Sequence, residues 1–278
     1  MRALADTFKK VGIDDPSLDA RQLLCAAGGF DHAALIRDPD APLGDDAAAR
    51  LATFGARRAA REPVTRILGQ RGFWSLELDV APNVLDPRPD TEVLIEAAVA
   101  HFAERQDDAL AIADLGSGSG AIVCALLDVF PRSNALAVDV SPDACALTER
   151  NLRRCGFNGR AAVQCAPWTS LNGLELDLVI SNPPYIPTET IVGLDPEVAR
   201  FDPHLALDGG PDGLNAYREL AETIPRLLAK GGITILEIGI DQAGDVAEIF
   251  RGNGFDLAAT SRDLGGIDRA LTFRLQTG

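Results

Sequence analysis

The sequence is short of positive charge, of paired cysteines and of long apolar runs, and each shortage excludes a class of protein. Its 278 residues carry 26 Lys and Arg against 41 Asp and Glu, a formal net charge of −15, so the chain as a whole repels polyanions such as nucleic acids. The five cysteines form no C-x-x-C pair, which excludes a zinc knuckle and disfavours a disulfide framework. No apolar run approaches the length of a membrane span, and the first residues, MRALADTFKK, lack the apolar core of a secretory signal. We therefore expect a soluble, cytoplasmic protein that binds neither DNA nor membranes.

Two parts of different texture follow one another along the chain. Residues 1–80 are nearly balanced in charge and show helical patterning with no strand alternation, whereas almost all of the net negative charge lies after residue 80. Between them, apolar residues alternate from Phe73 to Val80, which is typical of an extended connector or a short β-hairpin. We predict a helical domain at 1–75, a connector at 76–90 and a catalytic domain at 91–278.

After residue 90, short apolar strands alternate with amphipathic helices. Strands are predicted at 110–114, 134–140, 177–181 and 233–238, and helices at 121–130, 142–155, 215–230 and 242–251. This alternation predicts an α/β fold with a doubly wound, mostly parallel sheet. Two further strands, around Phe255 and Leu271, are separated only by a loop at 265–268, which is too short for a crossover helix. We expect these two strands to pair antiparallel.

A glycine-rich loop leads from the first of these strands into a helix, where a ligand can approach backbone N–H groups closely. Asp139 ends the next strand, where a carboxylate can accept hydrogen bonds from the ribose hydroxyls of a nucleoside. The pattern leaves a nicotinamide dinucleotide and S-adenosylmethionine both open, because each places an adenosine ribose there. The predicted cofactor-binding residues of this loop and strand are Asp114, Gly116, Ser117, Gly118, Ser119, Gly120 and Asp139.

The turn Asn182-Pro183-Pro184-Tyr185 ends another apolar strand and decides between these cofactors. Two consecutive prolines fix φ and remove two N–H donors, so the turn becomes a rigid set of acceptors. An amide nitrogen is a poor nucleophile, but two acceptors that hold both of its N–H bonds direct its lone pair toward a methyl donor. We predict that Asn182 Oδ1 and the Pro183 carbonyl are these acceptors, that Pro184 stiffens the turn and that the Tyr185 ring packs on the target group. This chemistry needs no metal, and Asn182 is also expected to contact the cofactor.

At these residues the chain resembles the class I S-adenosylmethionine-dependent methyltransferases, and specifically the protein-(glutamine-N5) methyltransferases of peptide chain release factors. The resemblance implies a seven-stranded Rossmann-like sheet, a smaller N-terminal all-α domain that binds the substrate, and S-adenosylmethionine as cofactor. It also implies methylation of the glutamine in the Gly-Gly-Gln loop of release factors. The residues that carry it, beside the glycine loop and the turn, are Glu62-Pro63, Ile67-Leu68-Gly69, Val84-Leu85, Pro87-Arg88-Pro89, Thr91-Glu92, Leu236-Glu237-Ile238-Gly239 and Asp268-Arg269.

The chain departs from the family pattern at Arg66, Asp86 and Pro167. The family usually has Tyr at the first position, Ile at the second and Asp at the third. By resemblance, that Asp would accept a hydrogen bond from the adenine amino group, which Pro167 cannot do. Adenine recognition would then rest on stacking with Trp168 and on a nearby backbone group, and we expect a weaker cofactor affinity than is usual in the family.

Other substrates fit the same turn. A glutamine of a ribosomal protein would use identical chemistry, and so would adenine N6 or cytosine N4 of a nucleic acid, although the net charge and the absence of a basic insert disfavour the latter. A non-catalytic cofactor-binding protein is a further alternative.

Glu237 and Asp208 could either orient substrate or hold local structure. A group of arginines in the first part is either a solvated helix face or a docking surface for an acidic partner: Arg50, Arg57, Arg58, Arg61, Arg66 and Arg71.

Overall fold

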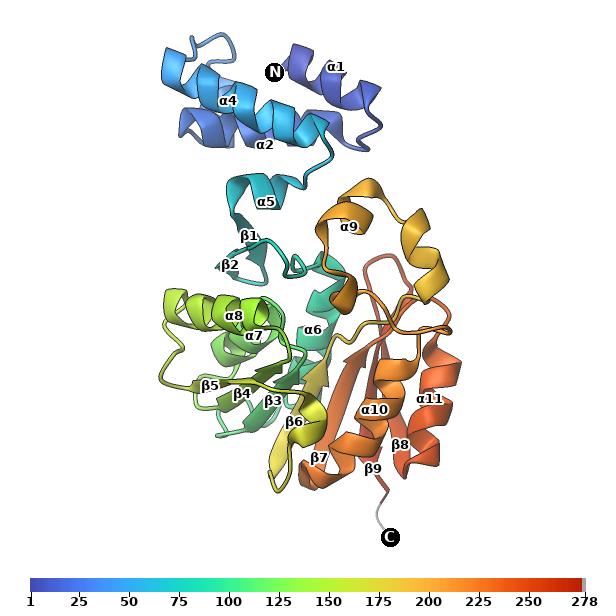
Figure 1. The fold of residues 1–278 in the computed structure, drawn as a ribbon. Coiled ribbons are helices and arrows are strands. Elements are labelled where there is room, and N and C mark those ends of the chain that lie inside the picture. Colours follow the sequence, from blue (N-terminus) through green and yellow to red (C-terminus); the bar gives the residue numbers. More distant parts are fainter. Residues whose placement is uncertain (277–278) are drawn as a thin grey trace. The chain divides into compact units, whose positions relative to one another are not determined.

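The computed structural model describes residues 1–276, and the chain forms two compact units (Figure 1). The first comprises Met1–Gln70 and the short segment Asp195–Phe201, and the second comprises Arg71–Leu194 and the chain from Asp202 onward. The catalytic domain expected at 91–278 would include Asp195–Phe201, which the structure groups with the first unit. Glu197 of that segment forms ion pairs with two arginines of the first unit.

The first unit is a cluster of helices around a small apolar core. Phe8 and Leu23 are fully buried there, together with Ile67. Asp15 caps one helix by accepting a hydrogen bond from Leu18 N at 2.9 Å, and Gly29 ends it in the left-handed conformation that glycine tolerates. The helices of this unit are α1 (Arg2–Lys10), α2 (Pro16–Gly28), α3 (His32–Arg37), α4 (Asp45–Ala59), α5 (Val64–Leu68) and α9 (Pro196–Phe201).

Arginines of α4 and of the turn after it hold this unit together from within. Arg58 is only 6% exposed and forms ion pairs with Asp19 at 2.6 Å and Glu197 at 2.7 Å. Arg61 pairs with Glu197 at 2.6 Å and donates to the carbonyls of Val11 and Gly12. Neither the solvated face nor the docking surface expected from the sequence describes Arg58 and Arg61, because their guanidinium groups are already engaged inside the unit.

The second unit begins with a two-stranded hairpin and continues into a sheet of seven strands. The hairpin pairs β1 (Gln70–Phe73) with β2 (Leu76–Asp79), somewhat earlier than the expected connector. The sheet has the order β5-β4-β3-β6-β7-β9-β8, in which every pairing except those of β9 is parallel. Its strands are β3 (Ala111–Leu115), β4 (Asn134–Asp139), β5 (Ala161–Cys165), β6 (Leu176–Ser181), β7 (Leu228–Glu237), β8 (Phe255–Arg262) and β9 (Asp268–Leu275). The predicted α/β fold and the antiparallel pairing of the last two strands are both confirmed.

Helices cover both faces of this sheet because its central strands are apolar on both sides. Ile112 and Leu178 pack in one core with helices α6 and α7, while Ala113 and Val179, their neighbours in sequence, pack in a second core with α10 and α11. Figure 1 shows these two layers on either side of the strands. The helices of the unit are α6 (Glu92–His101), α7 (Ala121–Val129), α8 (Pro142–Arg154), α10 (Asn215–Thr223) and α11 (Ala243–Gly252), with short 3₁₀ turns η1 (Pro89–Thr91), η2 (Trp168–Ser170), η3 (Thr188–Gly193), η4 (His204–Ala206) and η5 (Ile224–Arg226).

Two local predictions were wrong. The helix expected over 215–230 ends at Thr223, and β7 begins at Leu228, five residues before the expected strand. Pro225 explains the early end, since a proline has no N–H to donate to the carbonyl four residues before it and its ring clashes with that carbonyl. The sequence pattern also gave no sign of β5, whose edge position leaves all of its residues exposed or half-buried. Among the described residues, none of the helices is long and apolar enough to cross a membrane.

Candidate active site

The glycine loop occupies the carboxyl end of β3, where it turns into α7. Gly116, Gly118 and Gly120 all have positive φ, between 55° and 79°, which L side chains rarely adopt. A Cβ on Gly120 would stand 3.0 Å from a methyl group of Thr148, whereas one on Gly118 would meet nothing within 4 Å. Gly120 therefore permits close packing of the loop on α8, and Gly118 leaves open space above the backbone.

Asp139 fixes this loop from the end of β4. Its Oδ2 accepts a hydrogen bond from Gly118 N at 2.9 Å, and its Oδ1 accepts one from Ser141 N at 2.8 Å. Each carboxylate oxygen has a second lone pair, so both can still accept from a ligand hydroxyl. Ser141 in turn caps α8 by accepting from Ala144 N. The carboxylate is thus held in one orientation by two backbone donors beside the loop.

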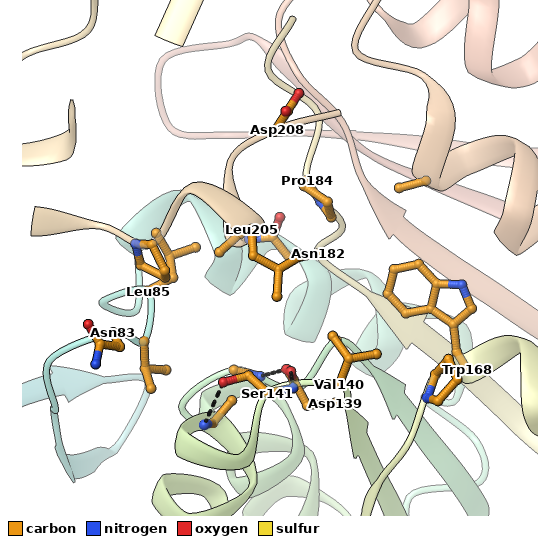
Figure 2. A pocket seen from close by; sticks show the side chains of 18 of the residues that line it. Asn83, Leu85, Asp139, Val140, Ser141, Trp168, Asn182, Pro184, Leu205 and Asp208 are labelled. Atoms are coloured by element: carbon orange, nitrogen blue, oxygen red, sulfur yellow. Dashed lines mark hydrogen bonds between the residues drawn. The ribbon is translucent and has the colours of Figure 1, made fainter. Parts of the chain in front are cut away.

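A cavity of about 540 Å³ lies against this edge of the sheet. That volume is in the range of small-molecule and cofactor sites, about 300–1,000 Å³. Figure 2 shows Asp139 and Ser141 below the cavity, Trp168 at one side and Asn182 above. The other residues around it include Asn83, Val84, Leu85, Gly116, Gly118, Val140, Ala144, Pro167, Pro184, Pro203, Leu205, Ala206, Asp208, Asn215, Ala216 and Glu219.

Trp168 supplies the flat apolar wall of the cavity. A Cβ on Gly116 would lie 3.3 Å from its ring, so the indole packs directly over the glycine loop. Pro167 precedes it in extended conformation and also lines the cavity. A planar heterocycle can stack on this indole, but the proline offers no side-chain acceptor for an exocyclic amine.

The Asn182-Pro183-Pro184-Tyr185 turn begins directly after β6, on the same edge of the sheet. Asn182 Nδ2 donates to Thr91 Oγ1 at 3.1 Å, which anchors the amide by its nitrogen. Among the residues that the structure describes, none donates a hydrogen bond to Asn182 Oδ1 or to the Pro183 carbonyl oxygen. Two acceptors of the turn therefore remain available to a ligand with N–H donors.

Tyr185 continues the turn away from the cavity wall. Its hydroxyl donates to Glu237 Oε1 at 3.3 Å, and its backbone carbonyl accepts from the side chain of Gln242. A Cβ on Gly239 would come within 3.0 Å of the Tyr185 ring, so the ring packs against bare backbone. Burial and the nearby Glu237 carboxylate raise the pKa of Tyr185.

Comparisons with known proteins agree with this geometry. The family model of the PrmC N-terminal domain matches residues 1–69, and that of the methyltransferase small domain matches residues 89–192. The chain is 45% identical to the release factor glutamine methyltransferase of Caulobacter vibrioides over 97% of its own length and 93% of that protein. It is 42% identical to the protein of the same name in Rhodospirillum rubrum, over 96% and 81% of the two chains. This chain belongs to the release factor glutamine methyltransferase family.

Likeness to solved structures supports the fold alone. A methyltransferase from Pyrococcus furiosus matches 72% of this chain and 89% of its own with a TM-score of 0.51 and 16% sequence identity. Family membership and fold together make the chain an S-adenosylmethionine-dependent methyltransferase. Its residues fit such a cofactor, since Asp139 offers carboxylate acceptors, Gly118 leaves space for a ligand and Trp168 offers a stacking surface.

The residues predicted for the site in this family member fall into two groups. Gly116, Gly118, Asp139, Trp168, Asn182 and Pro184 lie around the cavity. Asp114 instead lies fully buried behind the loop, where burial raises its pKa to about 7 although the Val123 N–H opposes the rise. The other predicted residues that do not line the cavity are Ser117, Ser119, Gly120, Pro183 and Tyr185.

Sequence reasoning named Thr91 only as part of the family pattern and missed its hydrogen bond with Asn182. Thr91 lies 91 residues before Asn182 and ends the short turn η1, and no local pattern links the two. Of the two acidic residues left unassigned, Asp208 lines the cavity but its Oδ1 accepts from Thr188 Oγ1 at 2.6 Å and Gly210 N at 2.9 Å. Its carboxylate therefore holds the loop around it.

Proposed function

We propose that the chain transfers a methyl group from S-adenosylmethionine to the side-chain amide nitrogen of a glutamine in a peptide chain release factor. The carrying observation is the placement of Asn182, anchored by its nitrogen and with Oδ1 available, across one cavity from Asp139 and the glycine loop (Figure 2). The names of relatives at 45% and 42% identity support a glutamine of the release factor as substrate. The Gly-Gly-Gln loop as the target rests on the resemblance in sequence. A protein that acts on release factors works in the cytoplasm.

Each residue of the cavity has a distinct task in this proposal. The Asp139 carboxylate accepts from the ribose hydroxyls, the backbone of Gly116 and Gly118 lets the nucleoside approach, and Trp168 stacks on the adenine. When bound, S-adenosylmethionine supplies an electrophilic methyl group on a sulfonium. The residues of the first unit would recognise the release factor, in line with the match of residues 1–69 to the PrmC N-terminal domain.

The turn activates the amide by orienting it and by stabilising charge on its nitrogen. Asn182 Oδ1 and the Pro183 carbonyl each accept one N–H of the substrate carboxamide, which holds the nitrogen lone pair out of the plane of those bonds and toward the methyl group. As the nitrogen–carbon bond forms, positive charge grows on the nitrogen and these two acceptors stabilise it. The sulfur–carbon bond breaks, and the surplus N–H proton of the methylated amide leaves to water.

The experiment separates the rival substrates in parallel reactions. Purified release factors, ribosomal proteins and DNA are incubated with the enzyme and labelled cofactor, and mass spectrometry locates the methyl group. We expect one added CH₂ on the glutamine of the release factor loop.

Asn182→Ala should lower the rate at least about a hundredfold, the cost of one lost transition-state hydrogen bond. Asn253→Ala, at an exposed residue that follows α11, is the matched control and should leave the rate unchanged. Methylation only of the DNA or of a ribosomal protein would refute the assignment.

A further inference from the structure

A buried carboxyl lies directly under the Asn182-Pro183-Pro184-Tyr185 turn. Glu237 ends β7, the strand that pairs with β6 through Ser181 and Leu236, and is only 2% exposed. Its Oε1 accepts from the Tyr185 hydroxyl at 3.3 Å, while its Oε2 has no hydrogen-bond partner of regular distance and angle among the described residues. Burying a carboxyl with an unused oxygen is costly, so this group calls for a physical reason.

Thr91 connects this carboxyl to the catalytic asparagine. Its hydroxyl oxygen accepts from Asn182 Nδ2 at 3.1 Å, and the residue is 4% exposed, so the hydroxyl hydrogen needs an acceptor inside the protein. The Glu237 carboxyl is an acceptor near enough for the Thr91 hydroxyl to lower its pKa. Burial raises the pKa of Glu237 to about 7, and hydrogen bonding from the hydroxyls of Thr91 and then Tyr185 opposes the rise. The Glu237 carboxyl thus acts on both ends of the turn. It accepts a hydrogen bond from Tyr185 directly, and it acts on Asn182 through Thr91.

Charged and titratable groups on the surrounding elements act on Glu237 from several sides. Arg269 of β9 favours the carboxylate, although its own guanidinium pairs with Asp263 at 3.2 Å. Asp90 of η1 disfavours the carboxylate. The Tyr217 hydroxyl of α10 donates to the Glu237 backbone carbonyl at 2.9 Å and leaves the side chain to Thr91 and Tyr185.

We propose that Glu237 and Thr91 are positioning residues for methyl transfer, which fix the direction of the Asn182 amide. An ionised carboxylate only accepts hydrogen bonds, so Thr91 must donate to Glu237 and can only accept from Asn182. Asn182 then presents its nitrogen to Thr91 and keeps Oδ1 for the substrate. This inference rests on the proposed function and extends it to two residues that touch neither cofactor nor substrate.

Protonation of Glu237 would reverse the chain of hydrogen bonds. A protonated carboxyl can itself donate, which frees the Thr91 hydroxyl to donate to Asn182 Oδ1. The amide then either loses its free acceptor or turns its NH₂ group toward the NH₂ group of the substrate, which is a repulsive arrangement. The rate of methyl transfer should therefore fall as the pH is lowered through about 7, the pKa of Glu237.

Four variants and one control test this arrangement. Thr91→Val and Glu237→Gln should each lower kcat by about ten- to a hundredfold, as expected when a reacting group is misplaced, with the KM for S-adenosylmethionine unchanged. Thr91→Ser keeps the hydroxyl and should restore kcat. The double variant should be no slower than the slower single variant, because the two residues act through one chain of bonds. The control is Thr234→Val, which removes a buried hydroxyl without a partner from the same strand and should leave kcat unchanged.

Two further readouts separate positioning from mere structure and from the proposed activity. The acidic limb of the pH–kcat profile should disappear in Glu237→Gln. The side-chain amide resonances of Asn182, followed by NMR without substrate, should titrate near pH 7 in the wild type and not in Glu237→Gln. Wild-type kcat in Thr91→Val and Glu237→Gln, losses that multiply in the double variant, or Asn182 resonances that do not titrate would overturn the inference. An inactive wild type would instead refute the proposed function, and the resonances would still test the positioning role.

Discussion

Arg58→Ala is the sharpest test of how the first unit holds the segment Asp195–Phe201. The guanidinium, only 8% exposed in its side chain, lies 2.6 Å from Asp19 and 2.7 Å from Glu197. Removing one partner from a buried ion pair typically costs about 3–5 kcal/mol, because the other charge stays buried without compensation. Glu197 keeps Arg61, so we place the cost at the lower end, about 3 kcal/mol, or roughly a hundredfold in the opening equilibrium of α9.

Hydrogen exchange read peptide by peptide is the assay, since a chain of two units does not unfold in one step. Amides of α9 and of the first turn of α2 should lose about a hundredfold of protection in Arg58→Ala. Arg58→Lys should be intermediate, because a single ammonium cannot bridge two carboxylates as a planar guanidinium does. Arg57→Ala is the matched control: its pair with Glu62 is 40% exposed on the arginine side and is worth about 0–1 kcal/mol. Equal loss of protection in both alanine variants, or none in Arg58→Ala, would refute the reasoning.

Two further predictions concern the cofactor side of the cavity. Pro167→Asp should increase the affinity for S-adenosylmethionine measured by calorimetry, because it adds an acceptor beside Trp168; an unchanged affinity would contradict the assigned adenine position. Gly120→Ala should destabilise the fold by more than Gly118→Ala, since both glycines have positive φ but only at Gly120 would a Cβ meet Thr148 at 3.0 Å. Gly118→Ala should instead weaken cofactor binding, and the reverse ranking in thermal unfolding would contradict the packing argument.

The sequence was informative where one residue type determines the local backbone. Gly116, Gly118 and Gly120 predict a loop that a ligand can approach closely, and all three have positive φ in the structure. The Pro183-Pro184 pair predicts a stiff turn without reference to any distant residue. The alternation of short strands and helices predicted the doubly wound sheet for the same reason. Where the local signal was overlooked, at Pro225, the predicted helix ran past its true end.

The arginines of the first unit show where such reasoning stops. Sequence spacing showed positive charge concentrated in one stretch, but the charges that neutralise Arg58 lie 39 residues before it and 139 residues after it. One of these partners, Glu197, lies in Asp195–Phe201, the segment that the structure groups with the first unit and the sequence did not. Whether a surface arginine is solvated, docks a partner or is buried in an ion pair is decided by residues that only the folded chain brings near.

Glu237 and Thr234 show why burial alone does not mark a functional residue. Both lie in β7, both are at most 2% exposed, and each has a side-chain oxygen with no hydrogen-bond partner among the described residues. The hydroxyl of Thr234 is one small dipole, and replacing it by a methyl of the same shape should be neutral or stabilising. Glu237 differs because its carboxyl reaches Tyr185 and acts on Thr91, the anchor of Asn182, so its protonation state decides which atoms of the turn accept hydrogen bonds. Glu237 is therefore a positioning residue and Thr234 is not, because only the side chain of Glu237 is linked by hydrogen bonds to the turn that holds the substrate.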